Sequence, residues 1–126
     1  MSDAVIVEAV RTPIGRRGGQ FKDVHPTELA AWVLNAVVAR AGIEHGQVDD
    51  IIMGCVSAVG DQALNIGRNS ALLAGFPPAV PATTIDRQCG SSQQAVHFAA
   101  SAIDSGTADI VIAAGVESMT RVPMGS

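Results

Sequence analysis

Aromatic side chains are almost absent from this sequence. Phe, Trp and Tyr make up 3% of the 126 residues, and there is no tyrosine. Charged residues are also scarce, at 16%, against the usual quarter. Because hydrophobic residues still reach 48%, the core must consist mainly of Ala, Val, Ile and Leu. So much aliphatic surface on a short chain indicates that another chain or further sequence covers part of it.

Several kinds of protein are excluded by what is missing. No apolar run approaches the roughly 18 residues that a membrane-spanning helix needs. The net charge of −4 argues against a general nucleic-acid binder. The two cysteines, Cys55 and Cys89, form neither a metal motif nor a disulfide framework. Because residues 1–3 do not begin a secretory signal, we expect a cytoplasmic protein with reduced thiols and no resident metal.

Short aliphatic runs alternate with helix-like segments along the chain. The expected strands are 4–10, 51–56, 80–85 and 109–116. The expected helices are 26–41, 65–74 and 90–105. This order predicts an α/β fold with a mostly parallel sheet, helices on both faces and right-handed crossovers. The nearly continuous aliphatic run at 109–116 is typical of a central strand that is covered on both faces.

Two of the helices have apolar patterns that predict what they bury. The first has a stripe at helical spacing that we expect to face the core, formed by Leu29, Trp32, Val33, Ala36 and Val37. Gly42 is its expected C-terminal cap. The helix after Cys89 is apolar on every side, which is typical of a central buried helix. Nothing else in this chain is expected to cover one of its faces.

Cys89 stands where a short strand turns into that helix, within the stretch 86–95. A thiol there is close to unpaired backbone N–H groups and to the positive end of the helix dipole, and both favour the nucleophilic thiolate. The small residues Gly90, Ser91 and Ser92 leave room for a substrate. The same geometry offers backbone donors to an oxyanion. The alternative is a small apolar residue that closes a tight turn.

Other chemistry-bearing residues have a structural and a functional interpretation. Cys55 lies in a predicted strand, which favours an inert core thiol. The glycine-rich loop 11–19 is either solvated or contacts an anionic substrate, and it does not have the pattern of a phosphate-binding P-loop. His25 precedes a helix and favours a capping or solvated role. His97 favours a core or interface histidine over a base or ligand, and Arg68 is either a solvated charge or an interface contact.

Taken together, four stretches in this order resemble the thiolase family of acyl-CoA C-acyltransferases. They are Arg11-Thr12-Pro13-Ile14-Gly15, Asn65-Ile66-Gly67-Arg68-Asn69, Arg87-Gln88-Cys89-Gly90-Ser91 and Gly115-Val116-Glu117-Ser118-Met119. The resemblance extends over essentially the whole chain. The chain departs from the family pattern in two places that bear on substrate range: Asp86 stands where Asn is common, and Ser92-Gln93 where Gly-Leu is usual.

The resemblance implies a two-step reaction of fatty-acid metabolism. Cys89 would take an acyl group from a 3-ketoacyl-CoA as a thioester, acetyl-CoA would leave, and coenzyme A would collect the acyl group; the reverse is a Claisen condensation. The backbone N–H of Cys89 would form half of an oxyanion hole. Coenzyme A is then a co-substrate, and no permanently bound cofactor is implied. The resemblance assigns no residue here to coenzyme A binding.

Thiolases are much longer than 126 residues. The resemblance therefore implies that residues 1–126 are an incomplete amino-terminal domain. It would lack its last strand, the loop domain and a carboxyl-terminal half with further catalytic groups. As partners it implies that missing half and a homodimer or tetramer, in which the 80–86 strand pairs with its twofold mate. Two alternatives stay open: a related ketoacyl synthase-like enzyme with a cysteine nucleophile, and a non-catalytic assembly fragment.

Overall fold

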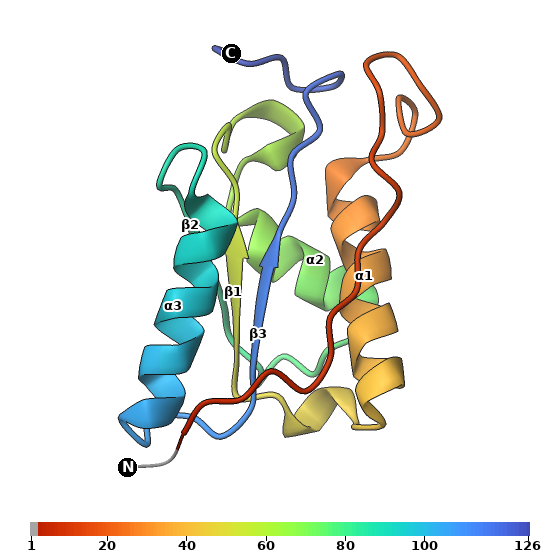
Figure 1. Ribbon diagram of the computed structural model, residues 1–126. Coiled ribbons are helices and arrows are strands. Elements are labelled where there is room, and N and C mark those ends of the chain that lie inside the picture. The colour runs from red at the N-terminus through yellow and green to blue at the C-terminus, as the bar shows by residue number, and fades with distance from the viewer. Residues whose placement is uncertain (1–2) are drawn as a thin grey trace.

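The computed structural model describes residues 3–126 and has an α/β architecture (Figure 1). Its main elements, in chain order, are α1 (Pro26–Ala41), β1 (Asp50–Gly54), α2 (Ile66–Ala74), β2 (Ala82–Ile85), α3 (Ser91–Asp104) and β3 (Val111–Gly115). Two short 3-10 turns, η1 (His45–Gln47) and η2 (Gly60–Gln62), flank β1. The three strands form a parallel sheet in the order β2-β1-β3. The predicted fold class is confirmed. Within residues 3–126, no helix has the length and apolar character to cross a membrane.

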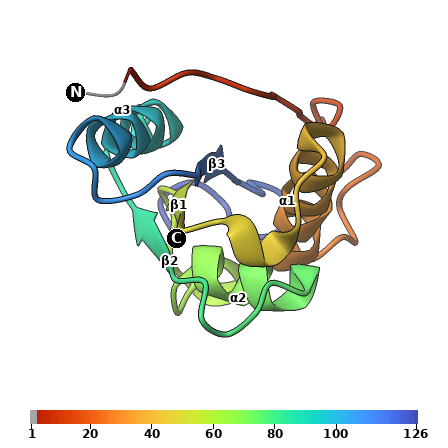
Figure 2. The ribbon, with the colours of Figure 1, turned by 90° about the horizontal axis from the view of Figure 1, so that it is seen from below.

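Helices cover both faces of the sheet (Figure 2). Alternate residues of β1 point to opposite faces, as a strand requires. Ile51 and Met53 belong to the larger core cluster, which contains residues of α1 and α2. Ile52 belongs to the smaller cluster with Ala95 and Ala99 of α3. β1 therefore joins the two halves of the core.

The prediction of a buried strand at 4–10 is wrong for the described residues. The segment has no strand structure, and Val5, Ile6 and Val7 are between 73% and 82% exposed. Polar contacts hold it instead: the Ala4 N–H donates to Asp104 Oδ1 at 3.0 Å, and Glu8 pairs with Arg40 at 3.2 Å. An aliphatic run gives strand propensity, but a strand also needs a neighbour that takes its backbone hydrogen bonds. No described strand pairs with this segment.

The central strand is β1 and not, as predicted, the run at 109–116. β1 pairs with β2 on one side and with β3 on the other. β3 lies at an edge of the described sheet, and four of its five residues are only partly buried. The aliphatic content of a strand indicates how far its side chains are buried by other elements, but it does not determine the order of strands in the sheet.

The helices do not bury the faces that their sequences predict. α1 buries Ala30, Ala31, Leu34 and Val38, which form a different face from the predicted stripe. No residue of that stripe is fully buried, and Trp32 is 45% exposed. α3 buries only Ser91, Ala95 and Ala99, and Phe98 is 46% exposed. Because both helices are apolar around much of their circumference, packing against neighbours selects the buried face. The predicted all-round burial of α3 is wrong within this chain.

Local capping signals predicted the helix ends well. Gly42 and Gly75 adopt left-handed conformations after α1 and α2. The Asn65 side chain accepts from the Arg68 N–H at the start of α2. The His25 Nδ1 accepts from the Thr27 N–H at 3.2 Å, which confirms its capping role.

Arg68 is not the solvated charge that the sequence offered as one alternative, and a role in an interface stays a prediction. Its guanidinium donates to Val80 O at 2.6 Å and to Pro78 O at 3.0 Å. It therefore fixes the loop that leads into β2. The carbonyls of a loop that is folded back on a helix are acceptors that a sequence pattern does not reveal.

At the amino ends of β1 and β3, one carboxylate joins the two strands. Asp49 Oδ2 accepts from the Asp109 N–H at 2.7 Å and from the Ile110 N–H at 3.0 Å. These bonds, above all that from Ile110, hold the pKa of the Asp49 carboxyl below its ordinary value of 3.8. The contribution to stability is therefore fully present above that pH and is lost as the pH falls through the lowered pKa.

We predict that Asp49→Asn lowers the urea midpoint of unfolding at pH 6, and that the gap from the unmodified protein narrows by pH 3. The reason is that protonation removes the same carboxylate from the unmodified protein at low pH. The measurement is urea unfolding followed by circular dichroism at several pH values. Asp23→Asn, at an exposed position outside the sheet, is the control. A gap that stays constant from pH 6 to pH 3 would contradict this account.

Candidate active site

The turn that carries Cys89 connects the carboxyl end of β2 to the start of α3, and the thiol is exposed. Asp86 caps this turn, because its Oδ1 accepts from the Gln88 N–H at 2.7 Å and its Oδ2 from Gln88 Nε2 at 3.2 Å. Gln88 has φ 44°, in the left-handed region that non-glycine residues rarely adopt. The chain therefore reverses sharply just before Cys89.

A buried serine holds the turn from within. The Ser91 hydroxyl donates to Gln88 O at 2.7 Å and accepts from the Arg87 N–H at 3.0 Å. Ser91 is 4% exposed, so these bonds are shielded from water. The sequence suggested only that Ser91 keeps the turn sterically open. The structure adds that its hydroxyl ties the turn together while Cys89 stays accessible.

Two paired glycines bring α3 against the sheet. Gly54 ends β1 and Gly115 ends β3, and the two are partners in the parallel ladder. A Cβ added at Gly54 would lie 2.5 Å from the Ser92 backbone nitrogen. A Cβ added at Gly115 would overlap Ser92 Oγ and lie 2.8 Å from Ser92 Cβ. Glycine at both positions is therefore what allows the first turn of α3 to rest on the ends of β1 and β3.

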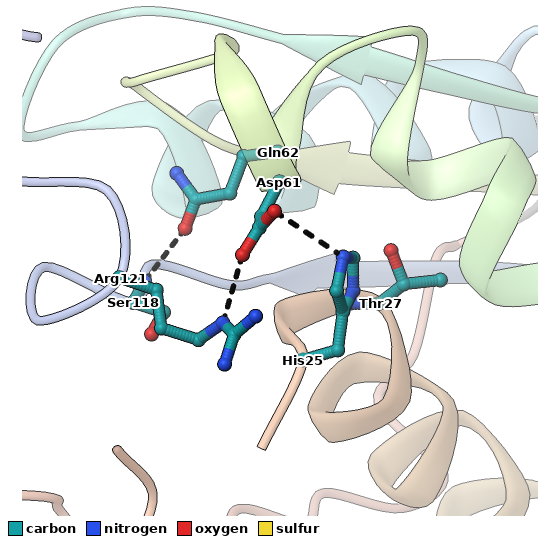
Figure 3. A network of polar contacts seen from close by, with 6 residues as sticks. All are labelled: His25, Thr27, Asp61, Gln62, Ser118 and Arg121. Carbon is teal, nitrogen blue, oxygen red and sulfur yellow. Dashed lines mark hydrogen bonds and ion pairs between the residues drawn. The ribbon is translucent and has the colours of Figure 1, made fainter. Parts of the chain in front are cut away.

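A polar network lies just beyond these glycines and involves Glu117, which the sequence placed only at the sheet's carboxyl edge. Its carboxylate accepts from the Val56 N–H at 2.8 Å, the Ser57 N–H at 3.1 Å and Gln62 Nε2 at 2.9 Å. Gln62 is fully buried, and its Oε1 accepts from the Ser118 N–H at 2.7 Å (Figure 3). The network joins the loops after β1 and β3 through η2.

A second set of contacts surrounds η2 (Figure 3). Asp61 Oδ2 accepts from Arg121 Nε at 2.8 Å, and Asp61 Oδ1 lies 3.7 Å from His25 Nε2. The start of α1, η2 and the segment after β3 are thus linked on the surface. The side chains of His25 and Asp61 are 45% and 36% exposed, so these contacts contribute less than the buried Gln62 network.

Cys55 is the less reactive of the two thiols. It is 1% exposed, and burial, followed by the charges of Glu117 and Asp86, raises the pKa of its thiol to about 12. This agrees with the interpretation as an inert core cysteine. A shallow hollow at the surface is lined by Cys55 and Asp86 rather than by Cys89. We give Cys89 the greater weight, because a nucleophile must be accessible as a thiolate.

The remaining candidates do not converge on Cys89. His97 is exposed on α3, so its assignment to the core of this chain is wrong, and an interface role stays a prediction. Most of the loop 11–19 is exposed, and the Gly18 N–H donates to Thr120 Oγ1 at 3.0 Å, after β3. No cluster of metal-binding side chains occurs in the part of the chain that the structure describes.

We predict that iodoacetamide labels Cys89 at least about 100-fold faster than Cys55 in the folded protein at pH 7. Cys89 is exposed, whereas a pKa of about 12 leaves only about one Cys55 thiol in 10⁵ ionised. The measurement is timed alkylation followed by peptide mapping. Protein unfolded in guanidinium is the control, in which the two rates should converge. Equal rates in the folded state would remove the distinction between the two thiols.

Comparison with known proteins gives a consistent result. Residues 4–126 match the family described as "Thiolase, N-terminal domain". The chain is 50% identical over 126 residues to the steroid 3-ketoacyl-CoA thiolase FadA6 of Mycobacterium tuberculosis, covering all of this chain and 31% of that protein. It is 48% identical over 124 residues to the beta-ketoadipyl-CoA thiolase of Acinetobacter baylyi, covering 98% of this chain and 31% of that protein.

A solved structure extends the likeness to three dimensions. The Bacillus anthracis acetyl-CoA acetyltransferase matches with a TM-score of 0.90 and 47% identity, over 95% of this chain and 30% of that one. This chain therefore spans about a third of the length of the relatives that it matches. The family match favours a thiolase over a ketoacyl synthase-like enzyme. The chain belongs to the thiolase family, of which it represents the amino-terminal domain.

Proposed function

We propose that Cys89 is the nucleophile of an acyl-CoA C-acyltransferase that acts on 3-ketoacyl-CoA. The observation that carries this proposal is the setting of the thiol. Cys89 is exposed on a hydrogen-bonded turn at the amino end of α3, whereas Cys55 is buried. In parallel α/β sheets this carboxyl edge is where ligands bind.

The chemistry proceeds in two steps. The Cys89 thiolate attacks the C3 carbonyl carbon of the substrate, and the resulting alkoxide reforms a carbonyl as the C2–C3 bond breaks. The electron pair of that bond leaves on C2 as the enolate of acetyl-CoA, which takes up a proton. The acyl group stays on Cys89 as a thioester. The thiolate of coenzyme A then attacks the thioester, releasing the shortened acyl-CoA and the Cys89 thiolate; the reverse sequence is the condensation.

The position of Cys89 at a helix amino end suits the charge that develops after attack. The partial positive charge of the first turn of α3 favours the oxyanion. We propose that the backbone N–H of Cys89 donates to that oxyanion. Because Ser91, Asp86 and the glycine pair already fix the turn, such a donor would need little reorganisation in the transition state.

Substrate class and cofactor use follow from the relatives. Their names, steroid 3-ketoacyl-CoA thiolase and beta-ketoadipyl-CoA thiolase, describe coenzyme A thioesters with different acyl groups. We therefore propose a 3-ketoacyl-CoA as the substrate of this chain and coenzyme A as its co-substrate. We also propose that the protein is located in the cytoplasm.

We also propose that residues 1–126 need the remaining two-thirds of a thiolase to turn over. The three histidines are engaged or placed elsewhere: His25 caps α1, His45 contacts Asn35, and His97 lies on exposed α3. An α-carbon base and the remaining oxyanion donors would come from the carboxyl-terminal half. Phe98 and Val96, both nearly half exposed on α3, support cover by that half or by a second subunit in a dimer or tetramer. The chain alone would then act only as an assembly fragment.

We predict that Cys89→Ala abolishes thiolysis of acetoacetyl-CoA in the complete enzyme without unfolding it. The substitution removes the nucleophile from an exposed position and changes little packing. Cys55→Ala is the matched control: it should cost about 1 kcal/mol of stability and keep the activity, because it shortens a buried side chain. The measurements are a thiolysis assay and thermal unfolding. Full activity in the Cys89→Ala enzyme would refute the assignment.

A further inference from the structure

Glu117 is a carboxylate that the proposed reaction does not use. It lies after β3 and is partly buried. Its two oxygens accept from two consecutive backbone N–H groups after β1, those of Val56 and Ser57, and from the amide of buried Gln62. With three donors directed at it, the carboxylate is a structural acceptor and not an available base.

The same two strands have a similar carboxylate at their other end. Asp49 precedes β1 and accepts from the N–H groups of Asp109 and Ile110 before β3. Glu117 follows β3 and accepts from the N–H groups that follow β1. Each side chain thus joins β1 to β3 through two consecutive backbone donors. Asp49 is exposed and accepts through one oxygen, whereas Glu117 is partly buried and also accepts from Gln62. Only Glu117 lies at the end of the sheet on which the Cys89 turn rests.

The connection from Glu117 to that turn is short. Glu117 is two residues after Gly115, and Val56, whose N–H donates to it, is two residues after Gly54. Gly115 and Gly54 are the ladder partners on which Ser92 rests. Ser92 follows Ser91, whose hydroxyl holds the backbone of Arg87 and Gln88 in place. Because these groups are in close contact, a change in the spacing of the two strand ends would displace the turn.

We propose that Glu117, together with Gln62, is a positioning residue for Cys89. It fixes the distance between the ends of β1 and β3. The glycines at those ends then determine how far the turn that carries Cys89 lies from the sheet. This inference rests on the proposed role of Cys89 in acyl transfer. In this proposal Glu117 acts through its bonds to Val56, Ser57 and Gln62 and not through contact with the substrate. Its effect is geometric, so it falls on the chemical step and not on substrate affinity.

Glu117→Gln tests the proposal because it keeps the size of the side chain. Only the amide oxygen can then accept, and the amide nitrogen must face a backbone N–H or the Gln62 amide, which places donor against donor. In the complete enzyme we expect kcat for acetoacetyl-CoA thiolysis to fall at least about tenfold, with KM within about threefold. We also expect amide hydrogen exchange in residues 86–94 to become faster under native conditions.

Asp49→Asn is the matched control for lost stability. It removes a similar joint between β1 and β3 at the end of the sheet that is remote from Cys89. We expect kcat and the exchange of residues 86–94 to stay within about twofold of the unmodified enzyme. Equal losses of kcat in the two variants would overturn the proposal, and so would an unchanged kcat in Glu117→Gln. Hydrogen exchange does not depend on activity, so failure of the Cys89 assignment, seen as turnover by Cys89→Ala, stays distinguishable.

Gly115→Ala tests the second link and applies even if Glu117→Gln does not fold. The added methyl group overlaps the Ser92 side chain and should lift the turn, again lowering kcat at least about tenfold. Ser92→Gly removes both side-chain atoms that the methyl group would meet. The double variant Gly115→Ala/Ser92→Gly should therefore recover to within about threefold of Ser92→Gly alone. No loss in Gly115→Ala, or a loss that Ser92→Gly does not relieve, would overturn the proposed connection.

Discussion

The close contact between the first turn of α3 and the paired glycines Gly54 and Gly115 determines where the Cys89 turn lies. It brings a helix amino end to the carboxyl edge of a parallel sheet, and the Cys89 turn comes with it. Any Cβ at Gly54 would collide with backbone atoms, which cannot move aside as a flexible side chain can. The absence of side chains at Gly54 and Gly115 therefore fixes the position of the Cys89 turn.

Around that contact, hydrogen bonds to polar side chains hold the backbone in place. Ser91 holds the backbone on the helix side, and Glu117 with Gln62 holds the loops on the sheet side. These groups are partly or fully buried. Hydrogen bonds to a carboxylate are stronger in such an environment than at the surface. The two cysteines have different environments. Burial, followed by the charges of Glu117 and Asp86, raises the pKa of Cys55, whereas Cys89 is exposed on the turn.

The parallel α/β fold and the helix caps were predicted correctly, whereas strand pairing and the buried faces of the helices were not. Asn65 and Gly75 defined α2 because caps act within one helical turn. The exposed segment 4–10 was misassigned because a strand depends on a partner elsewhere. The sequence located Cys89, but it did not show that Gln62 bonds Glu117, 55 positions away. A single buried amide produces no repeating pattern in the sequence, so its partner cannot be predicted from the sequence.

The most direct test is to trap the acyl group on the protein. The complete enzyme is mixed with acetoacetyl-CoA in the absence of free coenzyme A, quenched with acid, digested and analysed by mass spectrometry. The account predicts one acetyl group on the peptide that contains Cys89 and none on the peptide that contains Cys55. The peptide with Cys89 should lose the label when coenzyme A is added before the quench. An acetyl group on another residue, or turnover with Cys89 never acylated, would contradict it.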